Sequence, residues 1–269
     1  SADYFNTNGY QNISTLAPAA ANSIKNGQGD AASHNSNVRL QGYFKPTQDS
    51  NGFFRVGYHT MSDLSSGYSF ATNLMQETDV AVGATTRLAD RAKVDVNFFY
   101  ENTNFNKQNG STTTGKSNGI SAGTPYINAT YKDPYSTVGA SAQYTKELTG
   151  MIDQYLVGVD ARNVAGSNLT NNLNNNGTVA AVNYGQGSQT FLGLMGQLKS
   201  KTTSIPLETT LAARVDQWSS QTPTSYNAGI NGANPQYQNI PNQSKTQLSP
   251  TLGFLYKATS NWDLRTAAY

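Results

Sequence analysis

The run DVAVGATTRLADRAKVDVNFFYE, from Asp79 to Glu101, decides the fold, because apolar and polar residues alternate along both of its halves. Successive side chains of a β-strand point to opposite faces, so the run predicts two strands that each have one apolar and one polar face. The short segment from Ala89 to Arg91 separates them and indicates an antiparallel hairpin. The apolar set is Val80, Val82, Ala84, Leu88, Val94, Val96, Phe98 and Tyr100, and the opposing set is Ala81, Gly83, Thr85, Arg87, Lys93, Asp95, Asn97, Phe99 and Glu101.

The same alternation recurs from one end of the chain to the other. Counting an opening strand near Tyr4 to Ile13, it predicts about eleven strands, which is the signature of a transmembrane antiparallel β-barrel with one face toward lipid and the other toward the lumen. The fold class is therefore all-β. The remaining segments are Val38–Phe44, Phe54–His59, Val138–Tyr144, Tyr155–Ala161, Leu192–Leu198, Leu211–Asp216, Leu252–Tyr256 and Trp262–Leu264.

The composition argues against an ordinary soluble domain. Charged residues make up 13% of the chain and hydrophobic residues 36%, whereas soluble domains have roughly 25% and 45–50%. Asn, Gln, Ser, Thr and Gly replace both classes, and they suit a wet lumen and long loops. The absence of Cys excludes disulfides and thiolate metal sites. A net charge of +2 without a basic run argues against nucleic acid as a partner.

The connections between strands alternate between two lengths, as they do when short turns and long loops lie on opposite sides of a membrane. This order holds if Ile127–Thr130 is assigned to the third long loop, and we make that assignment. The short connections are Pro46–Asn51, Ala89–Arg91, Lys146–Gly150, Lys201–Ser204 and Ala258–Asn261, and the long ones are Ser14–Ser33, Asp63–Glu77, Asn106–Tyr135, Asn163–Ser188 and Ser219–Ser244.

Aromatic residues of the lipid-facing set cluster at two levels, as expected at the two interfaces of a membrane. A soluble sandwich is the structural alternative, since packed sheets also alternate. It would bring Val94, Val96, Leu211 and Val215 together in a dry interior. The expected interface aromatics are Phe44, Tyr144, Tyr155, Tyr256 and Trp262 at the short-turn end, and Tyr58 and Tyr100 at the long-loop end.

Eleven strands do not close a barrel by themselves, because single-chain bacterial barrels use even numbers and an open edge in lipid is costly. Tyr269 could be the outward aromatic of a barrel C-terminus. Its phase contradicts this, because Trp262, Leu264 and Ala268 form the outward set and Tyr269 lies on the other face. We therefore expect further strands after Tyr269.

Three stretches resemble the N-terminal half of the barrel of TonB-dependent outer-membrane receptors. They are Tyr4–Ile13 (YFNTNGYQNI), Thr78–Gly110 (TDVAVGATTRLADRAKVDVNFFYENTNFNKQNG) and Leu248–Tyr269 (LSPTLGFLYKATSNWDLRTAAY). The last is the most specific, because strands of the form SPxLGxxYxxTxNxxLRxxxY are usual in this family. The resemblance spans nearly the whole chain and is diffuse in the loops.

This resemblance implies a bacterial outer-membrane protein with a 22-stranded barrel, a plug domain and uptake of a scarce solute such as a ferric siderophore, energised by TonB. Residues 1–269 would then be a partial barrel domain without the plug. The expected partners are outer-membrane lipid, a small-molecule solute and TonB, the last through a region outside this chain. A passive porin-like channel is the alternative. We expect neither an enzyme nor a cofactor.

Candidate site residues follow from their predicted place on the wall. Polar lumen-facing residues near the long-loop end, and aromatic residues in the long loops, are the candidates for solute contacts. Other lumen charges are candidates for contacts with a plug, and a solvated wall is the alternative for each of them. The solute candidates are His59, Glu101, Arg162, Asp216, Tyr68, Phe70, Tyr126, Tyr226 and Tyr237, and the plug or lumen candidates are Arg39, Arg55, Arg87, Asp95, Arg214 and Arg265.

Motifs for metal binding or catalysis are absent from the sequence. His34 and His59 are the only histidines, and their separation does not suggest a preformed metal site. Ser, His and Asp occur without a GxSxG elbow or similar context. We therefore predict neither a catalytic residue nor a bound metal cofactor.

Overall fold

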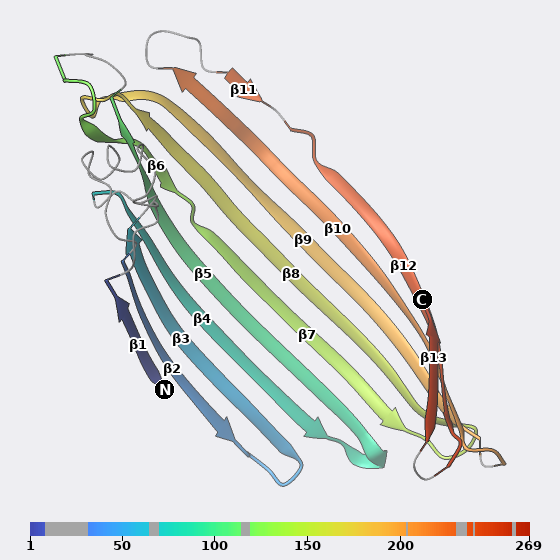
Figure 1. Cartoon of the computed structure of the whole chain (residues 1–269). Coiled ribbons are helices and arrows are strands. Elements are labelled where there is room, and N and C mark those ends of the chain that lie inside the picture. The colour runs from blue at the N-terminus through green and yellow to red at the C-terminus, as the bar shows by residue number, and fades with distance from the viewer. Residues whose placement is uncertain are drawn as a thin grey trace.

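The computed structural model describes residues 1–8, 32–64, 70–113, 119–202, 204–229, 236–238, 240–259 and 262–269. For residues 64, 222–229 and 236–238 it describes the backbone alone. Over these residues the chain forms one antiparallel sheet of thirteen strands (Figure 1). The strands are β1 (Ala2–Thr7), β2 (Ser33–Phe44), β3 (Ser50–Leu64), β4 (Thr72–Arg87), β5 (Ala92–Thr112), β6 (Pro125–Lys132), β7 (Tyr135–Glu147), β8 (Ile152–Leu173), β9 (Val179–Lys201), β10 (Leu207–Gly229), β11 (Gln236–Gln238), β12 (Gln243–Lys257) and β13 (Asp263–Ala268).

The thirteen strands occupy eleven positions in the sheet, because two positions hold two strands each. β6 and β7 both pair with β5 and β8, one beyond the other. β11 and β12 share a position beside β10 in the same way. The prediction of about eleven strands, made from the alternation alone, is therefore confirmed. Of the opening strand, Tyr4 to Thr7 lie in β1, and Tyr10 to Ile13 lie outside the described residues.

The assignment of Ile127–Thr130 to a loop was wrong, because these residues belong to β6. β6 nevertheless lies on the long-loop side, and it continues into the position of β7 past Pro134. Asp133 N still donates to Phe105 O at 2.8 Å, and Pro134 O accepts from Ser167 N at 3.0 Å. Proline has no N–H to give to the ladder, so the pairing is interrupted there without changing the order of turns and loops.

Four of the predicted long loops are in large part strand. In the loop predicted at Asp63–Glu77, β3 reaches Leu64 and β4 begins at Thr72. β5 continues to Thr112, β10 continues to Gly229, and β8 and β9 extend until a turn at Asn174–Thr178 joins them. In that turn Gly177 takes a φ of 80°, which an L side chain rarely adopts. The wall therefore extends past the apolar band on the long-loop side. The described parts of the short connections lie within two residues of the prediction, and residues 203, 260 and 261 lie outside the described residues. Ala89–Arg91 forms one 3-10 turn.

One face of the sheet is apolar from β2 to β13. Directly opposite residues of antiparallel strands point to the same face, so the register shows which side chains share a surface. Val80 pairs with Val56 and Tyr100, and Leu211 pairs with Leu198 and Leu252. The two-faced strands predicted from sequence thus align into a two-faced wall.

This apolar face has no protein layer over it. Leu40 is 63% exposed and Leu194 and Leu211 are each 54% exposed, and the four buried hydrophobic residues of the described chain are the alanines Ala71, Ala81, Ala92 and Ala129. A dry sandwich is therefore excluded. Exposed apolar surface costs roughly 25 cal/mol per Å² in water, so a face of this size calls for hydrocarbon around it. No helix of the described chain has the length and apolar character to cross a membrane.

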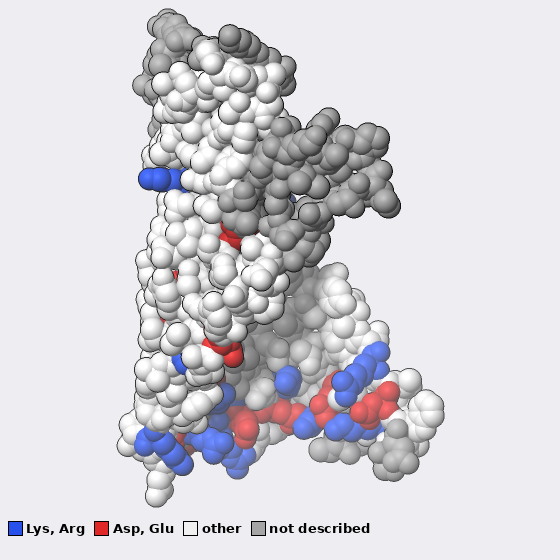
Figure 2. Space-filling model, turned by 60° about the vertical axis from the view of Figure 1, so that its left-hand side comes forward, with Lys and Arg blue, Asp and Glu red and all other residues white. Residues whose placement is uncertain are grey.

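The two ends of the wall differ in chemistry. The short turns gather at the lower end of Figure 1 and the long extensions at the upper end, with β1 and β13 at the two edges of a curved sheet. Figure 2 shows that charged side chains of both signs gather at the short-turn end, whereas the described surface toward the long-loop end is nearly uncharged in this view. The polar face between these ends carries the candidate site.

Candidate functional site

On the polar face, charged residues from neighbouring strands pair with one another. Arg55 of β3 places its Nε 2.8 Å from Asp79 Oδ1 of β4, an ion-pair distance at which the two atoms are not aligned for a hydrogen bond. Gly57 is the residue directly opposite Asp79, and a Cβ at Gly57 would fall on that carboxylate. The glycine therefore leaves the space in which the ion pair lies.

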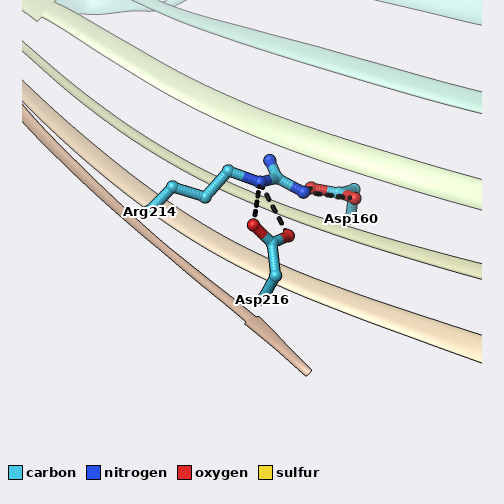
Figure 3. A network of polar contacts seen from close by, with 3 residues as sticks. All are labelled: Asp160, Arg214 and Asp216. Carbon is cyan, nitrogen blue, oxygen red and sulfur yellow. Dashed lines mark hydrogen bonds and ion pairs between the residues drawn. The ribbon is translucent and has the colours of Figure 1, made fainter. Parts of the chain in front are cut away.

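A cluster of three charged residues joins β8 to β10 across the intervening strand. The Arg214 guanidinium lies between two carboxylates, with Nη2 2.9 Å from Asp160 Oδ2 and Nε 2.7 Å from Asp216 Oδ1 (Figure 3). Each carboxylate accepts a charge-assisted hydrogen bond. Two carboxylates and one guanidinium leave the cluster with one net negative charge. Arg214, a predicted plug or lumen contact, and Asp216, a predicted solute contact, are thus bound to each other.

Gly193 of β9 makes this cluster possible. It lies directly between Asp160 and Asp216 in the register. A Cβ at this position would fall on Arg214 Nη2, so any larger residue would obstruct the path from Arg214 to Asp160. The ion pair thus joins β8 and β10 over β9, which has no side chain at this position.

The other predicted lumen charges differ in their partners. Arg162 stacks on Phe191 of β9, with its Cζ 4.5 Å from the ring centroid, in the geometry of a cation–π contact. Asp95 accepts from Thr85 Oγ1 at 2.5 Å and pairs with Lys93 at 2.9 Å. Arg39 and Arg87 form no ion pair within the described part of the chain.

At the short-turn end the polar face is hollowed into a pocket of about 780 Å³ with charged walls. Arg265, a predicted lumen residue, lines it and lies 3.6 Å from Asp263. Glu208 lies 2.9 Å from Lys257 and 3.8 Å from Lys201. The hydrogen bond to Glu208 raises the pKa of Lys257, which lies beyond Tyr256 at the turn. Some charges at this end are therefore paired, whereas Lys45, Arg87 and Arg91 form no ion pair in the described part of the chain.

The predicted solute residues lie in separate places. Glu101, Arg162 and Asp216 lie near the middle of β5, β8 and β10, and His59 lies nearer the long-loop end of β3. His59 and Glu101 are two strands apart near one edge, whereas Arg162 and Asp216 belong to β8 and β10. Phe70 and Tyr126 are half-buried. Tyr226 of β10 pairs in register with Tyr237 of β11 and with Tyr184 of β9, although the side chains of Tyr226 and Tyr237 are not described. Tyr68 lies outside the described residues.

The aromatic residues expected at the membrane interfaces lie on the apolar face. Tyr144 and Tyr155 approach with ring centroids 5.8 Å apart. The Phe44 side chain lies against Gly52 of the neighbouring strand, where a Cβ would collide with its ring. The exposed apolar surface includes Phe44, Tyr58, Tyr100, Tyr256 and Trp262.

Sequence reasoning missed the residues that act across strands. Asp79, Phe191 and Gly193 were not candidates, because only the register shows that they contact Arg55, Arg162 and Arg214. The one local signal is the spacing of Arg214 and Asp216, two positions apart on one face of a strand. Among the residues that the structure describes, no three His, Asp or Glu side chains are grouped so that they could hold a metal ion.

A sheet with an uncovered apolar face, a polar face full of paired charges and unequal connections at its two ends is a wall of a membrane β-barrel. The family model of the TonB dependent receptor-like β-barrel matches residues 3–269. The chain therefore belongs to the TonB-dependent receptor family, as a part of its barrel. It lies in the outer membrane of a Gram-negative bacterium.

Solved structures of such receptors show the same fold. The ferric yersiniabactin uptake receptor FyuA from Yersinia pestis has a TM-score of 0.66 at 10% identity, over 99% of this chain and 40% of that one. The copper transporter OprC has a TM-score of 0.61 at 13% identity, over 86% of this chain and 36% of that one. The ferric citrate transporter FecA has a TM-score of 0.59 at 14% identity, over 88% and 36%. No curated protein matches at the sequence level.

Proposed function

We propose that the chain forms part of the barrel of an outer-membrane receptor that takes up a scarce solute, with energy supplied through TonB. The observation that carries this proposal is the family match over residues 3–269 to a sheet whose uncovered apolar face suits lipid. The chain spans about 40% or less of the similar receptors, so uptake belongs to the complete protein. The chain's own part is to form the wall, and no catalysis is proposed for it.

Contacts with a plug domain are the role we propose for lumen charges that remain unpaired on the wall. Arg39 and Arg87 have no ion-pair partner among the described residues, so their charge is available to another domain in the lumen. Arg55, Asp95, Arg214 and Arg265 are already engaged within the sheet. They would contact a plug as members of ion pairs rather than as free charges.

Solute contacts belong, in this proposal, to the polar face from the middle of the strands to their long-loop end. Glu101 is directly opposite Asp79, whose carboxylate is paired with Arg55. Among the described residues Glu101 itself forms no ion pair. Arg162 on Phe191 presents a cation over an aromatic surface. The names of similar receptors include copper and several iron chelates, so the fold does not determine the solute.

Uptake assays in living cells test the proposal against a passive channel. We expect deletion of the gene to abolish high-affinity uptake of the solute, and deletion of TonB to have the same effect. Uptake that continues without TonB and rises in proportion to external concentration would establish the porin-like alternative. A matched strain that expresses an unrelated porin controls for general permeability.

A further inference from the structure

The long-loop end of the polar face holds a group of side chains that the uptake proposal leaves unexplained. Met61 of β3 lies directly opposite Met75 of β4, and His59 lies directly opposite Glu77. The register between these strands is unshifted from Ser50 to Leu64, so all four share the face of Arg55. Two of the chain's four methionines are thus cross-strand neighbours beside one of its two histidines.

The spacing brings the donor atoms within reach of one ion. Directly opposite residues have Cβ atoms about 4.5–5.5 Å apart, and diagonal neighbours about 7–8 Å apart. The long, flexible Met side chains and the imidazole can therefore converge on one point above the sheet. His59, Met61 and Met75 are all half-buried, so the point lies against the wall rather than out in the lumen.

The donor set has a definite chemical preference. Thioethers are soft ligands that favour Cu(I), and imidazole also suits copper, whereas Mg²⁺ and Ca²⁺ require oxygen ligands. Glu77 lies directly opposite His59 and forms no hydrogen bond with it in the described structure. In the proposed site its carboxylate would accept the N–H of the metal-bound imidazole, as the partners of metal-bound histidines commonly do. The group therefore selects a soft cation.

The surroundings favour a positive charge. Glu77 and Asp63 form no ion pair within the described residues, and no Lys or Arg lies directly opposite either of them. The nearest cation in register is Lys107, opposite Asn73, and its ammonium group lies over the Tyr131 ring. Asp63 and Asn73 face each other one step beyond the methionines. Asp63 Oδ1 and Asn73 Oδ1 are buried without a hydrogen-bond partner in the described structure.

Simple packing is the competing explanation for the methionines. Met75 is also directly opposite Phe105, and a row of Met61, Met75 and Phe105 could be an apolar strip that uses sulfur–aromatic contacts. Packing does not explain why His59 and Glu77 form the neighbouring pair on the same face. It also does not explain the oxygens of Asp63 and Asn73 that lack hydrogen-bond partners in the described structure. Leucine fills the volume of methionine without a thioether, so it separates the two explanations.

We propose that His59, Met61 and Met75 form a binding site for a soft monovalent metal ion, Cu(I), at the long-loop end. The ion would be the transported solute itself or a part of that solute. This inference rests on the proposed uptake function and names the class of solute. The site lies beyond Tyr58, which marks the interface on the other face of the same strand. An ion bound there would be accessible from the outside of the cell.

The test is a titration of the native protein, purified from outer membranes in detergent, with Ag(I) as a redox-inert probe and with Cu(I) under reducing, anaerobic conditions. We expect Met61→Leu and Met75→Leu each to weaken binding of both ions at least tenfold, and His59→Gln to do the same. Met195→Leu is the matched control, because Met195 lies on the same face of β9 far from this group. It should leave the affinity unchanged.

Several outcomes would overturn the inference. Ag(I) binding that is unchanged in Met61→Leu and Met75→Leu would show that the methionines only pack. Zn(II) binding that depends on His59 but not on the methionines would also overturn it. A difference in electrophoretic mobility between unheated and heated samples verifies that each variant is folded. TonB-dependent uptake of another solute without Ag(I) binding refutes the metal site alone, whereas Ag(I) binding without any TonB-dependent uptake refutes the receptor function alone.

Discussion

At the scale of single residues, Gly193 controls an ion pair to which it contributes no side chain. A methyl group there would displace the Arg214 guanidinium from Asp160. We predict that Gly193→Ala destabilises the protein by about 1–2 kcal/mol, the cost of a charge-assisted contact that is partly exposed to solvent. The measurement is urea unfolding of the protein in lipid vesicles.

Gly196 provides the control on the same strand. An added Cβ would meet no atom within 4 Å at this position, which lies on the apolar face. Gly196→Ala should therefore change the unfolding free energy by less than about 0.5 kcal/mol. Equal effects of the two substitutions would show that loss of backbone freedom, and not the blocked ion pair, is responsible.

At the scale of strands, β9 tests which face meets lipid. Leu194 is 54% exposed near the middle of its apolar run, and Gln197 lies on the polar face. We predict that Leu194→Arg costs about 2–4 kcal/mol in vesicles, because an arginine near the middle of the lipid face must be desolvated, and that Gln197→Arg costs much less. Similar losses for both would argue against a lipid-facing wall.

The hairpin of β8 and β9 tests the orientation of the wall. Its turn at Asn174–Thr178 is at the long-loop end, and the turn at Gly150 is at the short-turn end. We predict that an epitope inserted between Asn176 and Gly177 is labelled by antibody on intact cells, whereas one inserted after Gly150 is labelled only after the outer membrane is opened. The reverse pattern would invert the proposed orientation.

The sequence predicted the strands well where lipid enforces a contrast between the two faces. Val94 to Tyr100 alternate because one face meets hydrocarbon and the other meets water. Beyond the apolar band both faces are wet, the contrast disappears, and β6 with the extensions of β8, β9 and β10 was therefore mistaken for loop. Strand signals based on hydrophobic period do not apply there.

The candidate site was less predictable, because it depends on register. That Met61 faces Met75, or that Gly193 lies under Arg214, follows from how many residues each hairpin holds between paired positions. One residue more or less would move every side chain to the other face. A single sequence identifies polar lumen residues such as His59 and Arg214, but it does not identify their partners.

At the scale of the whole molecule, the two tryptophans of this chain lie on opposite faces of the wall. Trp262 is 73% exposed at the apolar side, and Trp218 lies opposite Phe191 on the polar face. We predict that brominated lipid quenches the fluorescence of Trp262 but not that of Trp218. The contribution of each tryptophan is obtained by comparing the native protein with Trp262→Phe and with Trp218→Phe. Quenching of Trp218 by lipid would contradict the assignment of faces.

The lack of a large buried hydrophobic side chain among the described residues has a consequence for how this wall changes through evolution. A side chain on the outer face is surrounded by fluid lipid chains, so it needs to be apolar but does not need a shape that fits particular neighbours. Mutations there can accumulate one at a time without compensating partners, provided that the backbone ladder stays intact. Architecture can then persist long after sequence similarity has faded, in keeping with the 10–14% identity to receptors of the same shape.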